Sequence, residues 1–194
     1  FHSADQFADL LLIQNQDPDL IGNGNTPVKY DGKEIQRWGI IPPGSTETVI
    51  ETFSSVGSFT IVGGSGSNES TTTLDGNSIK VTASATTMTI DRTGLTPFAV
   101  DTTIPNRAQI SVYIPRGQIF NLSQGTANPP ITVRVGQDTT ANYYQFNFDR
   151  GVLFEGWNNL PLDFSAPSST VGAPNANALT AFRVTITSAS GILL

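Results

Sequence analysis

The feature that most constrains this fold is the alternation of apolar and polar residues over 131–164. Three aliphatic residues share one face of the first segment: Ile131, Val133 and Val135. This two-residue period is that of a strand with one buried face. The polar linker from Gly136 to Asn142 carries turn formers and predicts an antiparallel hairpin with the segment after it. A hairpin is only marginally stable alone, so its apolar face predicts a second sheet that covers it.

The same alternation recurs along the chain. Strands are expected at 48–53, 58–62, 78–83, 87–91, 108–114, 131–135, 143–148, 157–164 and 180–187. Flexible or polar loops are expected at 63–68, 116–130 and 165–177, where Gly, Ser, Asn and Pro gather. Eight or nine short strands with turns between them predict an all-β fold, a two-sheet antiparallel jelly-roll sandwich over 48–194.

Residues 1–47 differ in composition, with seven acids against three bases. Ser3 and Gln6 resemble the capping residues of one short helix, and the rest reads as an irregular extension. Its apolar residues either pack on the sandwich or dock on a neighbouring subunit. The docking candidates are Phe7, Leu10, Leu11, Ile13 and Trp38.

The charge balance excludes several classes of function. The net charge is -6 and Lys and Arg form no cluster, which argues against a nucleic-acid partner. No apolar run approaches the ~18 residues of a membrane span, so membrane insertion is not expected. Charged residues make up only 13% of the chain, and the absence of cysteine excludes disulfides. This neutral Ser/Thr-rich composition suits the exposed faces of an extracellular or virion-surface β-protein from a bacterial or phage source.

Catalytic chemistry finds little support in the sequence. The single histidine, His2, lies at the start of the chain, where nothing positions it for a triad or a metal site. The nine acids of residues 48–194 fall where turns and strand ends use acids routinely. We therefore assign no catalytic residue and expect a protein that is not an enzyme.

A family resemblance rests on the order of several segments. These are Leu74–Val81, the 108–114 strand, the 131–148 hairpin, Glu155–Leu162 and the strand around Phe182. Together they resemble the galactose-binding-like jelly-roll domains, which include carbohydrate-binding modules of glycoside hydrolases and similar modules of phage virion proteins. The resemblance implies a non-catalytic binder without cofactors other than a structural calcium ion. Glu51 and Asp75 are the candidate calcium ligands, although the last strand lacks the acidic residue that many members use.

A glycan surface is predicted on the polar face of the 143–148 strand. Tyr143, Gln145 and Asn147 share this face, and Arg134 and Tyr113 lie on strands expected to neighbour it. Aromatic rings and hydrogen-bonding side chains of this kind hold sugars, but they also form ordinary cross-strand pairs on a solvated sheet. Trp157 is expected in the core at the start of its strand, rather than in a sugar platform.

Two functions follow from these features. The first is a structural component of a virion or surface assembly, attached through residues 1–47 to other subunits and present in several copies or as a homo-oligomer. The alternative is a glycan-binding module that adsorbs to a cell surface or polysaccharide. Either function places the protein on a virion surface or in an extracellular setting.

Overall fold

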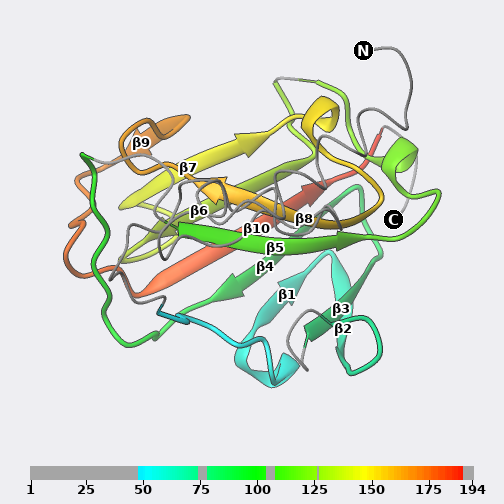
Figure 1. Cartoon of the computed structure of the whole chain (residues 1–194), viewed down its shortest axis with the longest axis horizontal. Coiled ribbons are helices and arrows are strands. Elements are labelled where there is room, and N and C mark those ends of the chain that lie inside the picture. The colour runs from blue at the N-terminus through cyan, green and yellow to red at the C-terminus, as the bar shows by residue number, and fades with distance from the viewer. Residues whose placement is uncertain (1–47, 74–77, 104–107, 126, 190–194) are drawn as a thin grey trace, which may run out of the picture. The chain divides into compact units, whose positions relative to one another are not determined.

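The computed structural model describes residues 48–73, 78–103, 108–125 and 127–189 (Figure 1). The chain divides into two units, Phe1–Thr48 and Val49–Leu194. All described strands belong to the second unit. The predicted N-terminal helix and the docking candidates Phe7, Leu10, Leu11, Ile13 and Trp38 lie outside the described residues.

The largest sheet contains six of the described strands, all antiparallel to their neighbours. In spatial order they are β1 (Thr60–Val62), β4 (Thr87–Arg92), β10 (Ala181–Thr187), β6 (Ile131–Gly136), β7 (Tyr143–Phe148) and β9 (Ser169–Val171). The predicted hairpin is β6 and β7, joined by the polar 137–142 loop. This sheet forms one layer of the sandwich.

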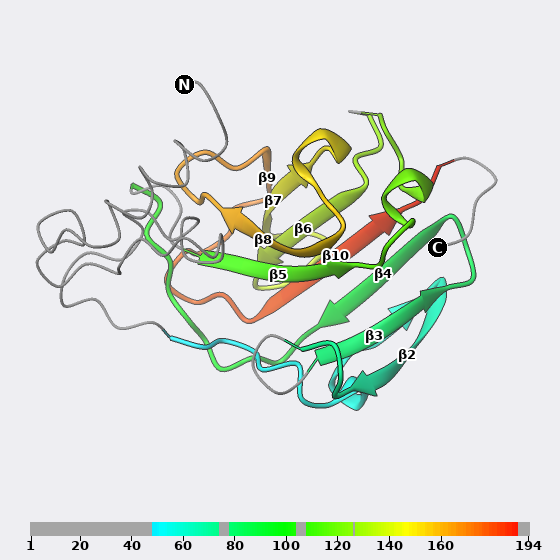
Figure 2. The ribbon, with the colours of Figure 1, turned by 45° about the vertical axis from the view of Figure 1, so that its right-hand side comes forward.

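Two short antiparallel sheets complete the described sandwich. One pairs β2 (Gly64–Glu69) with β3 (Ser78–Ala83), and the other pairs β5 (Ala108–Ile114) with β8 (Gly156–Leu162). Figure 2 shows β5 and β8 lying over the large sheet. Among the described residues, three short 3-10 helices lie in the connections: η2 (Val56–Ser58), η3 (Ile119–Asn121) and η4 (Arg150–Val152). The predicted all-β sandwich with a jelly-roll-like arrangement is confirmed.

The core follows the alternation seen in the sequence. Strand register places five apolar residues side by side across five strands: Ile61, Ile90, Val184, Val133 and Phe146. Leu160 and Leu162 of β8 and Ile114 of β5 are buried in the same cluster from the opposite layer. Each fully buried aliphatic side chain contributes about 1.5–3 kcal/mol of hydrophobic free energy, so this contact holds the two layers together.

The expected loop at 63–68 is wrong, because residues 64–69 form strand β2. Glycine is needed there for close approach. A Cβ on Gly64 would lie 2.5 Å from Met88 Sδ, and one on Gly66 would collide with the Ile61 side chain. The glycines that resembled a flexible linker therefore let β2 pack closely against its neighbours.

Two further expectations on strands are wrong. Residues 48–53 form no strand. Phe53 instead adopts a positive φ of 54° and stacks on Phe59, with ring centroids 5.3 Å apart. The polar 165–177 loop contains strand β9, which pairs with β7 and extends the large sheet. The ring centroid of Phe53 also lies 5.8 Å from that of Phe182 on β10. Both segments therefore contact residues far away in the sequence, and local alternation carries no information about such contacts.

Candidate functional site

The outward face of the large sheet brings together four of the five predicted glycan residues. Arg134 of β6 pairs in register with Gln145 of β7, and Asn147 and Tyr143 lie two residues to either side of Gln145 on the same face. Nε of Arg134 donates to Oε1 of Gln145 at 3.0 Å. The sequence therefore predicted the shared face of these residues correctly.

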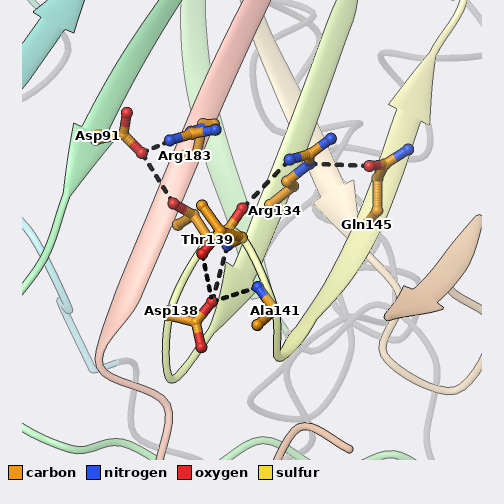
Figure 3. A network of polar contacts seen from close by, with 8 residues as sticks. Asp91, Arg134, Asp138, Thr139, Ala141, Gln145 and Arg183 are labelled. Carbon is orange, nitrogen blue, oxygen red and sulfur yellow. Dashed lines mark hydrogen bonds and ion pairs between the residues drawn. The ribbon is translucent and has the colours of Figure 1, made fainter. Parts of the chain in front are cut away.

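A polar network ties this face to the loop between β6 and β7 (Figure 3). Asp91 Oδ1 accepts from Nε of Arg183 at 2.6 Å and from Oγ1 of Thr139 at 3.0 Å. The backbone carbonyl of Thr139 accepts in turn from Arg134 at 3.2 Å. Thr139 is only 5% exposed, so the loop is folded against the sheet and covers part of the predicted surface.

Asp138 organises the same loop from inside. Its Oδ1 accepts the backbone N–H groups of Ala141 at 2.5 Å and Thr140 at 2.8 Å. These hydrogen bonds, that of Ala141 first, hold the pKa of the Asp138 carboxyl well below its usual range. The charged carboxylate thus stabilises the tight loop by accepting hydrogen bonds from its backbone N–H groups.

Tyr143, which directly follows the 137–142 loop, has no exposed ring face on which a sugar could stack. Tyr143 is 7% exposed, and the guanidinium carbon of Arg134 lies 4.6 Å from its ring centroid. Cation–π contacts of this kind stabilise a folded pair. Arg134 therefore contacts both Gln145 and Tyr143 on this face, and Gln145 in turn donates to Oδ1 of Asn147.

Tyr113 lies elsewhere, and the expectation that its strand neighbours this surface is wrong. Its strand β5 pairs with β8, in the other layer of the sandwich. There Tyr113 stands directly opposite Trp157, with ring centroids 5.4 Å apart and an interplanar angle of 63°. Tyr113 is 42% exposed and Trp157 is half-buried. The expectation that Trp157 belongs to the core is therefore also wrong.

The direction of Trp157 follows from the alternation of its own strand. Leu160 and Leu162 point inward and are buried, so the two-residue period turns Asn158 inward and Trp157 outward. Asn158 is only 2% exposed, yet its amide is fully used. Its Oδ1 accepts from Phe154 N–H, and its Nδ2 donates to the carbonyls of Phe154 and Gly156. The period of Leu160 and Leu162 was the sequence signal that could have placed Trp157 correctly.

The outward side chains of these two strands form a continuous surface, here called the β5–β8 outer face. It consists of Gln109, Ser111, Tyr113, Trp157, Asn159 and Pro161. Oγ of Ser111 donates to Oδ1 of Asn159 at 2.7 Å. This surface combines the exposed Tyr113 ring and the half-buried Trp157 ring with uncharged hydrogen-bonding groups on a pair of hydrogen-bonded strands. It is the candidate binding site.

The described residues provide no cluster of ligands for the predicted calcium ion. Glu51 accepts from Nε of Arg92 at 2.5 Å and from the backbone N–H of Phe53 at 3.0 Å. Asp75 lies outside the described residues. Among the described residues there is no group of three or more His, Cys, Asp or Glu side chains that could hold a metal ion.

Comparisons with protein-family models, curated proteins and solved structures returned no match. Within the described part of the chain, no helix has the length and apolar character needed to cross a membrane.

Proposed function

We propose that this protein is a non-catalytic carbohydrate-binding module, and that it holds sugar through the β5–β8 outer face. The observation that carries the proposal is the outward Tyr113–Trp157 pair, which is flanked by Ser111 and Asn159. This corresponds to the glycan-binding alternative drawn from the sequence, but at a different surface.

The chemistry of the pair suits a pyranose ring. The C–H face of a sugar is apolar and packs on aromatic rings, while its hydroxyls require hydrogen-bonding partners at the rim. Because Ser111 donates to Oδ1 of Asn159, the N–H groups of the Asn159 amide remain to donate to a sugar hydroxyl. The side chains stand on paired strands, which reduces the ordering cost of binding.

The environment of several acids supports binding without cleavage. A glycosidase acid needs a pKa raised towards the working pH. Hydrogen bonds from Thr71, that of its side chain first, instead lower the pKa of Glu69 to about 2, and the pKa of Asp138 is lowered as well. Asp91 and Glu51 are held in ion pairs with arginines. These four carboxylates have structural partners.

The assembly role is the second candidate, and the division of the chain at Thr48 favours it. In this proposal, residues 1–47 attach the protein to a virion or other surface assembly, and the sandwich displays the sugar site in several copies. Multiple copies raise the avidity of individually weak sites. Deletion of 1–47 should leave sugar binding by the sandwich intact while abolishing incorporation into the particle.

A glycan array followed by fluorescence titration tests the sugar site. In a Trp38→Phe background Trp157 is the single tryptophan, so its emission reports stacking directly. We expect sugar-dependent emission changes, and a loss of binding of about tenfold or more in Tyr113→Ala and Trp157→Ala. Gln145→Ala on the outward face of the large sheet is the matched control and should bind normally. Failure of the intact protein to bind any glycan, or normal binding by Trp157→Ala, would refute the proposal.

A further inference from the structure

The β5–β8 outer face is longer than a single sugar ring. Its side chains form three successive cross-strand pairs: Tyr113 with Trp157, Ser111 with Asn159, and Gln109 with Pro161. Outward residues on a strand repeat every two positions, or about 6.8 Å, so the first and third pairs lie about 14 Å apart. One ring placed on the aromatic pair would leave Gln109 and Pro161 uncovered.

The chemistry changes in order along this length. The aromatic pair lies at one end, Ser111 and Asn159 supply a hydroxyl and an amide in the middle, and the far end offers the amide of Gln109 beside the Pro161 ring. Gln109, Asn159 and Pro161 are all exposed. A chain of linked sugars that stacks at the aromatic end therefore meets new hydrogen-bonding groups with each further residue.

The face is also uncharged. Strands β5 and β8 contain no Asp, Glu, Lys or Arg. Glu155 and Arg116 lie on the connections at the aromatic end, where Glu155 accepts from the backbone N–H of Gly117 at 2.6 Å. Over the side chains of β5 and β8 themselves, a carboxylate or sulfate on the ligand would lose water without meeting a cation, since among the described residues beside the strands only Arg116, on the connection after β5, carries a positive charge. This disfavours charged glycans along the length of the face.

We infer that the ligand is a linear neutral polysaccharide that lies along β5 and β8, with about three consecutive sugar residues on the face. This inference rests on the proposed function and deepens it. The ring on Tyr113 and Trp157 supplies the stacking contact, and the following residues bind Ser111, Asn159 and Gln109.

The test uses length-graded neutral oligosaccharides as probes: β-1,4-linked gluco-, manno- and xylo-oligomers of one to six residues, with oligogalacturonides as the charged counterpart. The full chain is titrated by calorimetry and by Trp157 emission. Affinity for one neutral series should rise about tenfold or more from one residue to three and then level off. Oligogalacturonides should bind at least about tenfold more weakly.

Variants separate the extended site from the aromatic pair. Gln109→Ala should weaken binding of the trimer about five- to tenfold, the usual effect of one hydrogen bond, and leave the single sugar unchanged. Gln145→Ala is the amide control on the other sheet, and thermal unfolding checks that each variant folds. Equal affinity for one sugar and three, or preference for oligogalacturonides, would overturn the inference while leaving the aromatic site standing. No binding of any of these probes would overturn the inference, and the proposed function would fall with it only if the glycan array also showed no bound glycan.

Discussion

Oδ1 of Asn158 accepts the backbone N–H of Phe154 at 3.0 Å, across the turn that precedes β8. The Nδ2 of the same side chain donates to the Phe154 carbonyl at 2.8 Å and to the Gly156 carbonyl at 3.0 Å. The buried Asn158 amide therefore supplies hydrogen-bond partners to the N–H and carbonyl of Phe154 and to the carbonyl of Gly156. It also fixes the point at which Trp157 leaves the turn and joins the strand.

Asn158→Ala should lower the free energy of unfolding by about 2–3 kcal/mol, because the Phe154 N–H and two carbonyls lose a buried partner. Urea unfolding followed by circular dichroism measures the change. Asn159→Ala, the neighbouring exposed amide, is the matched control and should cost less than about 1 kcal/mol. Equal stability losses in the two variants would contradict the role of Asn158.

Asp91→Asn should destabilise the protein by about 2 kcal/mol. The partly buried guanidinium of Arg183, 2.6 Å from Asp91, would lose its charged partner, while the amide oxygen of the new Asn side chain still accepts from Thr139. Thr139→Val removes only the hydroxyl hydrogen bond and should cost about 1 kcal/mol. Asp149→Asn, an exposed acid whose side chain caps no helix, should change stability by less than about 0.5 kcal/mol. Chemical denaturation midpoints for the three variants provide the comparison.

Gly64→Ala should destabilise the sandwich by about 1–3 kcal/mol, because the new methyl group would collide with Met88 and the Thr82 carbonyl. The matched control is Gly151→Ala, since a Cβ there has no atom within 4 Å. Thermal melts of both variants give the result. A neutral Gly64→Ala would mean that β2 does not need glycine to approach the large sheet.

Stability should decrease as the pH falls from above 4.5 towards 2. The carboxyl of Glu69 has a folded-state pKa of about 2, below the ordinary 4.5, and the pKa of Asp138 is lowered in the same direction. The unfolded chain therefore binds more protons in this range, so each group's contribution is full above its ordinary pKa and is lost on acidification. Urea midpoints at several pH values measure the slope. In the double variant Glu69→Gln, Asp138→Asn, stability should depend less steeply on pH. An unchanged dependence would show that these two carboxylates do not stabilise the folded state through their hydrogen bonds.

Much of the fold could be predicted from the sequence because its strands are half-buried. Segments such as 78–83, 108–114 and 131–136 show strict alternation, and the structure has strands there. Prediction failed where distant contacts decide the conformation. The glycines at 63–66 resemble a linker, but β2 needs small residues to approach Met88 and Ile61. The opposite error occurred at 48–53, where alternation suggested a strand, but Phe53 has a positive φ and packs against Phe59 and, from the distant strand β10, Phe182.

The candidate site shows the same division. The local period could tell that Arg134, Gln145 and Asn147 share one face, and that Tyr113 and Trp157 each point away from their inward neighbours. The local period could not predict that the 137–142 loop folds over the face that carries Arg134 and Gln145, because this depends on a hydrogen bond from Thr139 to Asp91 of β4. Nor could it tell which strand lies beside β5.

The sequence by itself determined the strand faces, because side chains alternate wherever one face of a strand is buried. Only the tertiary structure decided which strands became neighbours, because pairing depends on how the whole chain closes around its core. That decision moved Tyr113 away from Tyr143 and placed it against Trp157. The predicted glycan surface on the large sheet is therefore largely a closed polar network, and the candidate site lies instead on the β5–β8 outer face, where Tyr113 is exposed.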